Sequence, residues 1–237
     1  MRSDLTRRAV AEAIGTALLV AVVIGSGIAA QRLSPHDLGL QLLESSVATG
    51  AGLIALILAF GSVSGAHLNP VVSLADRLLG GLSTRALATY VPAQLAGGCI
   101  GAVIANLMFE LPAVTASTHA RSSGGLWLGE AVATFGLLLV ILGVTRSGRS
   151  STAPFAVGGY IAAAYWFTSS TSFANPAVTV ARTLTDTFAG IKPSSAPAFI
   201  GFQIVGGLVA VALARFLFPG LLAADVVMPH EPDVPHG

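Results

Sequence analysis

Six long apolar runs dominate this chain of 237 residues and restrict the folds that are open to it. Each run has about the 20 apolar residues that a helix needs to cross the hydrocarbon core of a bilayer. Only 10% of the residues are charged, against about 25% in a typical soluble domain, so a soluble fold could not cover its apolar surface. We therefore predict an all-α membrane protein with six spans, at residues 9–30, 41–61, 84–108, 126–145, 154–171 and 196–218.

Two further segments, 66–80 and 174–185, are apolar but too short to cross a membrane. Each would form ten to twelve helical residues, roughly 15 Å, which is half of a hydrocarbon core. We therefore expect two re-entrant half-helices. The first span follows basic residues, as the core of a signal peptide does, but it is longer than the usual 7–15 residues and is expected to be retained.

Basic residues in the short loops predict the orientation, because they concentrate on the cytoplasmic side of a membrane. With the N-terminus inside, eight arginines are cytoplasmic and four basic residues are external. Both termini are therefore expected in the cytoplasm of a multi-pass cell membrane protein, which in a bacterium means the inner membrane. We expect one transmembrane domain over residues 1–225, followed by a flexible tail, rich in proline and acidic residues, at 226–237.

The two halves of the chain, about 9–109 and 126–218, repeat three motifs in the same order. Three spans in each half, an odd number, make the halves insert in opposite directions. Such an inverted repeat is typical of channels and transporters that place a site at the middle of the bilayer. The matching pairs are Glu12 with Glu130, Asn69-Pro70-Val71 with Asn175-Pro176-Ala177, and Gln94 with Gln203.

The paired Asn-Pro motifs predict where the half-helices begin. Asparagine is a favoured N-cap, and proline is the favoured first residue of a helix. One such pair would indicate only a turn or a helix start, whereas two at equivalent positions, each before a short apolar helix, are far more specific. The N-terminus of each half-helix is the positive end of its dipole, where cations and protons are disfavoured and a solute oxygen is favoured.

These motifs resemble the signatures of the aquaporin, or major intrinsic protein, family. The first resemblance is carried by Ser64-Gly65-Ala66-His67-Leu68-Asn69-Pro70-Val71-Val72 and the second by Ser172-Phe173-Ala174-Asn175-Pro176-Ala177. The resemblance covers about residues 9–218. It implies six tilted helices in an inverted repeat, two half-helices that meet tip to tip, and a homotetramer with one pore per subunit. It further implies a passive channel for water and small neutral solutes that uses no cofactor.

The resemblance also assigns roles to polar residues within the membrane. Asn69 and Asn175 are expected to cap the half-helices through their side-chain oxygens and to direct their amide groups into the pore, where two donors would hold a passing oxygen. His67, two residues before the first of these, is either a hydrogen-bonded structural residue or a gate.

Glu12 and Glu130 lie inside spans, where an ionisable residue is expected to be functional or paired. Catalysis or proton coupling is one interpretation. The other, which the resemblance favours, is that each carboxylate accepts hydrogen bonds from the non-helical backbone before a half-helix, because that backbone must be satisfied in lipid. Gln94 and Gln203 are expected to do similar work.

A narrow outer filter is the last implied feature, and counting without gaps from the Asn-Pro motifs places it at Thr49, Ala163, Ser172 and Val178. Water-selective members resemble one another in having an aromatic residue, a histidine and an arginine there. Val178 stands in the place of that arginine, which removes a strong donor and a cation barrier. We therefore expect a wide pore for solutes of glycerol or metalloid-acid size. Arg182 would reach the outer vestibule, a lipid headgroup or a loop carboxylate.

Other functions stay open at this point. A coupled secondary transporter also uses inverted repeats and broken helices, although it normally places a charge at its substrate site. A strict water channel is a further alternative, and an anion channel of the formate type would share the half-helices but lack twin Asn-Pro motifs. No spaced acid–base partner exists for Ser62 or Ser64, and no metal-ligand spacing or nucleic-acid patch occurs, so an enzyme, a metal site and a nucleic-acid partner are not expected.

Overall fold

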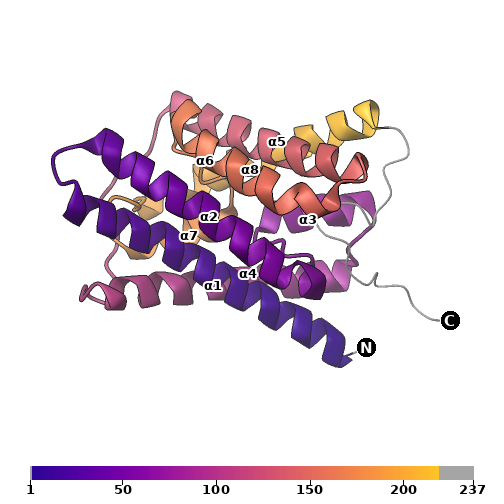
Figure 1. Cartoon of the computed structure of the whole chain (residues 1–237), viewed down its shortest axis with the longest axis horizontal. Helices are drawn as coiled ribbons and strands as arrows, with labels where there is room; N and C mark the ends of the chain where they lie inside the picture. The colour runs from indigo at the N-terminus through magenta and orange to yellow at the C-terminus, as the bar shows by residue number, and fades with distance from the viewer. Residues whose placement is uncertain (1, 219–237) are drawn as a thin grey trace.

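The computed structural model describes residues 2–218, and the tail expected at 226–237 lies outside the described residues. The described part is a helical bundle that holds two short helices within it (Figure 1). The long helices are α1 (Arg2–Leu33), α2 (Leu38–Ser64), α4 (Thr84–Met108), α5 (Gly124–Arg146), α6 (Ala153–Phe167) and α8 (Ala196–Leu217). The short ones are α3 (Pro70–Leu79) and α7 (Pro176–Ala181), and single 3-10 turns occur at η1 (Ser150–Thr152), η2 (Arg182–Leu184) and η3 (Pro193–Ser195).

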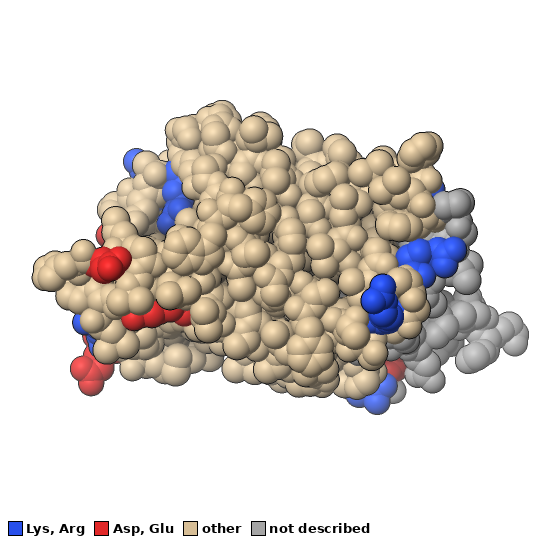
Figure 2. Space-filling model, turned by 45° about the horizontal axis from the view of Figure 1, so that its top comes forward, with Lys and Arg blue, Asp and Glu red and all other residues tan. Residues whose placement is uncertain are grey.

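The outer surface of the bundle is apolar between two charged ends. On the face shown in Figure 2, Lys, Arg, Asp and Glu side chains gather at the ends, and the broad band between them carries none. Large apolar side chains such as Val10, Leu107 and Val132 are exposed on the long helices. Five of these helices, α1, α2, α4, α5 and α8, are long and apolar enough to cross a membrane. This surface suits contact with hydrocarbon.

The fifth crossing differs from its prediction, because the span expected at 154–171 is helical only to Phe167 in α6. Thr168 ends the helix with an extended backbone, and its hydroxyl donates to the carbonyl of Ala164 at 2.7 Å. Thr171 and Ser172 then adopt positive φ values of 62° and 50°, which no helix permits. At 1.5 Å per residue, the helix spans roughly 22 Å, less than a hydrocarbon core.

Equivalent helix pairs from the two halves are packed at backbone distance. A Cβ atom on Gly97 of α4 would lie 2.1 Å from the carbonyl oxygen of Ala13 in α1. A Cβ on Gly206 of α8 would lie 2.2 Å from the carbonyl oxygen of Ala131 in α5. Small residues allow this approach, which is the usual basis of helix association in membranes. The α1–α4 and α5–α8 pairs therefore form the two matched sides of the bundle.

The half-helices begin where the Asn-Pro motifs predict. Asn69 is the N-cap of α3 and Asn175 the N-cap of α7, with proline at the first helical position in both. The second is shorter than the ten to twelve helical residues expected over 174–185, since α7 has six residues and continues only as the 3-10 turn η2. In Figure 1 the two half-helices lie toward opposite ends of the bundle, so their N-termini meet inside it.

Candidate functional site

The tips of the half-helices are joined by a reciprocal pair of hydrogen bonds. The amide Nδ2 of Asn69 donates to the carbonyl of Ala174, and that of Asn175 donates to the carbonyl of Leu68, both at 2.8 Å. Each side-chain oxygen meanwhile accepts a bond at 3.0 Å from the backbone N–H two residues later. A primary amide carries two N–H groups. One N–H on each asparagine therefore stays available to a solute, and both residues line a central cavity.

Glu12 holds the chain that leads into the first half-helix. Its carboxylate is fully buried and accepts the backbone N–H groups of His67 at 3.0 Å and Leu68 at 2.7 Å. It also accepts the hydroxyl of Ser64 at 2.6 Å and the side-chain N–H of Gln94 at 2.7 Å. All four donors lie in the interior, so the carboxylate satisfies groups that lipid could not.

Glu130 does the same for the second half-helix. Its two oxygens accept the backbone N–H groups of Phe173 and Ala174, each at 2.9 Å, and it also accepts the side-chain N–H of Gln203 at 2.5 Å. Gln203 further donates to the hydroxyl of Thr179, as Gln94 of the first half donates to Ser73. The structural interpretation of the two glutamates and glutamines agrees with these contacts.

These bonds turn a row of carbonyl groups toward the cavity. A trans peptide unit directs its N–H and its C=O to opposite sides, and the described chain contains no cis peptide. Because the N–H groups of His67 and Leu68 point at Glu12, the carbonyls of Ala66 and His67 point away from it, on the side of the cavity that both residues line. The backbone achieves this turn through positive φ values, 47° at Ala66 and 48° at Leu68. The second half repeats the arrangement, with 50° at Ser172 and 48° at Ala174.

The cavity between the two halves has one polar and one apolar wall. Its volume is about 60 Å³, which is room enough for water. The re-entrant segments contribute carbonyls and amides, and the long helices contribute aliphatic side chains. Within residues 2–218, no Asp, Glu, Lys or Arg lines it. The aliphatic wall is built from Leu19 and Val23 of α1, Leu53 and Ile57 of α2, Leu137 and Ile141 of α5, and Val157 and Ile161 of α6.

Three of the four residues expected at the filter line this cavity, and one does not. Thr49, Ser172 and Val178 are buried and line it, whereas Ala163 is exposed on the outer side of α6. The assignment of Ala163 is corrected: two residues correspond to about 200° around a helix, so Tyr165 faces inward where Ala163 faces outward. The hydroxyl of Tyr165 lies 3.1 Å from that of Thr49, which places both at one level of the cavity.

The two remaining predicted residues lie in different positions relative to the cavity. His67 lines it, with its ring nitrogens near Ser73 and Asp76. Arg182 is buried behind the cavity wall: its guanidinium stacks 3.4 Å from the ring centre of Phe173 and donates to the carbonyl of Ala189. It therefore meets a loop carbonyl and an aromatic ring, not the lipid headgroup or loop carboxylate considered from the sequence.

Arg121, in the loop before α5, is a second cation at this end of the bundle. Its guanidinium lies 5.2 Å from the ring centre of Phe173 and donates to the carbonyl of Gly190 at 3.0 Å. Removal from water lowers the pKa of Arg121 from its usual value. Neither Arg121 nor Arg182 lines the cavity, so neither replaces the positive charge that water-selective members are expected to have in the place of Val178.

Within residues 2–218, a bundle of six long helices with two half-helices meeting at a cavity that no Asp, Glu, Lys or Arg lines defines a membrane channel of the inverted-repeat class. The sequence model of the family described as Major intrinsic protein matches residues 1–172, and the chain belongs to this family.

Proteins similar to this chain cover between two thirds and nine tenths of it. It is 51% identical over 214 residues to Aquaglyceroporin AqpS of Rhizobium meliloti (strain 1021), covering 90% of this chain and 91% of the relative. It is 34% identical over 187 residues to the Glycerol uptake facilitator protein of Pseudomonas aeruginosa, covering 67% of this chain and 66% of that protein. The crystal structure of the aquaglyceroporin from Plasmodium falciparum shares its fold with a TM-score of 0.68, at 22% identity, covering 91% of this chain and 96% of that one.

Proposed function

We propose that this protein is a passive channel for small uncharged solutes of glycerol or metalloid-acid size, together with water, and that it excludes protons and ions. The observation that carries the proposal is the cavity, with its polar strip, aliphatic wall and absence of a charged lining residue within 2–218. A polyol has hydroxyl groups and C–H groups along one chain, so it can use both walls at once. The names of the two bacterial relatives agree with this class of solute.

Ion exclusion follows from the two half-helix N-termini. The positive dipole ends of α3 and α7 both face the point where Asn69 and Asn175 meet. A cation there meets two positive ends, while a neutral oxygen accepts the free amide N–H groups. A water held by two such donors cannot also accept a proton from a neighbouring water, so the hydrogen-bonded chain is interrupted.

Selectivity by size depends on the level of Thr49, Tyr165, Ser172 and Val178. Three hydroxyl groups and one isopropyl group replace the charged donor expected in a strict water channel. Within the described residues, the Ser172 hydroxyl has no hydrogen-bond partner, and Ser172 is one of the residues that line the cavity. Tyr165 makes this level narrower on one side than a ring of small residues would be, yet it adds no charge. A neutral solute with several hydroxyl groups fits this lining.

The wider arrangement is part of the same proposal. The protein is a multi-pass membrane protein, and we place both termini in the cytoplasm because of the arginine distribution in the loops. This orientation puts α3 on the cytoplasmic side and α7 on the outer side. The resemblance to its family supports a homotetramer in the lipid bilayer with one pore in each subunit, and for a bacterial cell it supports the inner membrane.

Substitution at the filter tests the proposal in proteoliposomes, with stopped-flow light scattering for water, glycerol and a metalloid acid. Val178→Arg adds a long, permanently charged donor and is expected to reduce glycerol flux at least tenfold while reducing water flux much less. Thr49→Phe is expected to act similarly by bulk alone, and Tyr165→Phe, which removes one hydroxyl with little change in size, serves as the matched control for width. A folded Val178→Arg protein with an unchanged ratio of glycerol to water flux would contradict the assignment.

The same vesicles separate a channel from a coupled transporter. A passive channel shows flux that rises linearly with solute concentration and does not respond to an imposed proton or sodium gradient. Saturation at low solute, or flux driven by either gradient, would favour the transporter interpretation.

A further inference from the structure

Asp76, on α3, is a buried carboxylate that the scaffold described above does not use. Its side chain is fully buried, and neither oxygen has a hydrogen-bond partner within residues 2–218. The contact that it does make is with the imidazole of His67, whose Nε2 lies 3.3 Å from Oδ2 and forms a salt bridge when the ring is protonated. A buried carboxylate is costly unless it is paired, so the geometry indicates that Asp76 acts through this imidazole.

His67 is held from two sides within the cavity wall. Its Nδ1 lies 3.0 Å from the hydroxyl oxygen of Ser73, while its Nε2 faces Asp76. The edge of its ring meets Tyr90, with 5.5 Å between the ring centres. His67 lines the cavity, but Ser73 and Asp76 do not. Both ring nitrogens are therefore turned into the wall and away from the lumen.

This arrangement accommodates both protonation states of the imidazole without movement. Nε2 lies 3.3 Å from the Asp76 carboxylate, so a proton on this nitrogen would face the carboxylate whether the ring is neutral or charged. Only the role of Nδ1 changes: it accepts the Ser73 hydroxyl when the ring is neutral and donates to that oxygen when the ring is charged. A serine hydroxyl can donate or accept by rotation. The position of the ring is therefore the same in both states.

We propose that Asp76 is a positioning residue that holds His67 against the pore wall in both protonation states and thereby makes solute flux independent of pH. The inference rests on the proposed channel function. Without the carboxylate, an imidazolium loses its counter-charge, and the water of the lumen is the best remaining solvent for it. The ring then turns inward, where it narrows the pore and adds a cation.

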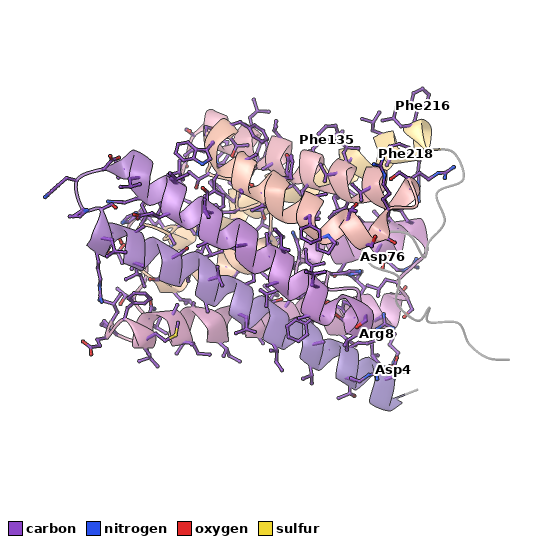
Figure 3. All side chains as sticks on the ribbon, in the orientation of Figure 1. Asp4, Arg8, Asp76, Phe135, Phe216 and Phe218 are labelled. Carbon is purple, nitrogen blue, oxygen red and sulfur yellow. The ribbon has the colours of Figure 1, made fainter. Side chains whose placement is uncertain are left out.

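The other charged groups around this pair are occupied elsewhere. From α1, Arg8 donates to the hydroxyl of Tyr90 at 2.8 Å, and Glu12 accepts four donors. From α8, Arg215 donates to the carbonyl of Leu78. Figure 3 shows Arg8 and Asp76 at the same end of the bundle. Asp76 is thus the carboxylate that faces the ring.

Glycerol flux through the full-length protein in proteoliposomes, at pH 7.5 and at pH 5.5, tests this role. Flux through the wild-type protein is expected to be equal at the two pH values. Asp76→Leu is expected to lose about three-fold or more at the lower pH, because a protonated ring without the carboxylate turns into the pore. Asp76→Asn, which keeps a neutral acceptor, is expected to lose less of its glycerol flux at the lower pH.

Two controls accompany these variants. Adding His67→Gln to Asp76→Leu should remove the pH dependence of the flux. Asp4→Leu, which removes a partly exposed carboxylate at the same end (Figure 3), is the matched control and should stay independent of pH.

A second measurement does not depend on flux. In ¹⁵N-histidine-labelled protein in micelles, with the His67→Gln spectrum identifying the signal, the Nε2 proton of His67 should be protected from exchange at both pH values and should lose that protection in Asp76→Leu. Protection without glycerol flux would support the positioning role and contradict the proposed channel function. Folded Asp76→Leu and Asp76→Asn proteins with pH-independent flux, or a wild-type protein whose flux falls in acid, would overturn the inference.

Discussion

Replacing Glu12 by alanine is expected to destabilise the protein far more than it changes selectivity. The carboxylate accepts four hydrogen bonds, and two of them come from the backbone N–H groups of His67 and Leu68. Those two groups lie in the fully buried turn before α3 and have no freedom to seek other acceptors. The side chains of Ser64 and Gln94 can rotate, so their loss is smaller.

The size of the effect follows from the number of stranded donors. Leaving one buried donor without a partner costs about 1–3 kcal/mol, so the two backbone groups alone cost about 2–6 kcal/mol. Glu130→Ala strands the backbone N–H groups of Phe173 and Ala174 and should cost a similar amount. Glu12 has one more donor than Glu130, so its replacement should be the more damaging of the two.

Thermal unfolding of purified protein in detergent, followed by the loss of the monodisperse peak on size-exclusion chromatography, measures these changes. Glu110→Ala removes an exposed glutamate and serves as the matched control, with a change of at most about 0.5 kcal/mol. A Glu12→Ala protein as stable as this control would refute the reasoning. A stable Glu12→Ala protein with a new order of solute preference would instead assign the carboxylate a direct part in transport.

Two further predictions concern packing and the outer loops. Gly97→Ala should separate α1 from α4, because its Cβ would lie 2.1 Å from a backbone carbonyl oxygen, and should lower the free energy of unfolding by about 1–3 kcal/mol. Gly201→Ala is the control, because its Cβ would meet nothing within 4 Å. Thermal unfolding in detergent compares the two variants. The backbone N–H of Thr118 donates to Asp186 and is the main cause that lowers the pKa of that carboxyl. Because the pKa of Asp186 is lowered in the folded protein, the contact stabilises the loop at every pH above the ordinary aspartate pKa of about 3.9. The contact is lost as the pH falls through the lowered pKa. Hydrogen exchange at the Thr118 amide should therefore accelerate at that pH in the wild type but not in Asp186→Asn.

The scaffold of the site could be predicted from the sequence because it depends on local rules repeated twice. An asparagine cap followed by proline marks a helix start, and Asn69 and Asn175 are the N-caps of α3 and α7. Non-helical backbone in lipid needs an acceptor, and each half offers a buried glutamate for that purpose, Glu12 or Glu130. The helix starts needed only the residue type and the register of the repeat, whereas the choice of a structural role for the glutamates also needed the resemblance to the family.

The details that depend on loop length could not be predicted. Counting back from the second Asn-Pro motif assumes that the segment after α6 has a fixed length, and this placed Ala163 where Tyr165 lies. The half-helix expected over 174–185 likewise assumes that α7 continues, yet it ends at Ala181. The contact of His67 with Asp76 spans a turn with positive φ values and half a helix, for which no sequence period exists.

The inverted repeat therefore preserves the backbone scaffold while the side chains around it make the two ends of the pore different. His67 and Asp76 of the first half correspond in the repeat to Phe173 and Arg182 of the second. Both pairs are buried contacts between the same two positions, one an imidazole with a carboxylate and the other an aromatic ring with a guanidinium.

The hydrogen bonds of the glutamates and asparagines involve backbone groups and must be the same in both halves for the half-helices to meet. The flanking pairs carry no such constraint, so opposite charges can occupy equivalent sites behind the lumen. Differences between entry and exit of a solute are accordingly expected to arise from these flanking pairs and from the filter, not from the asparagine tips.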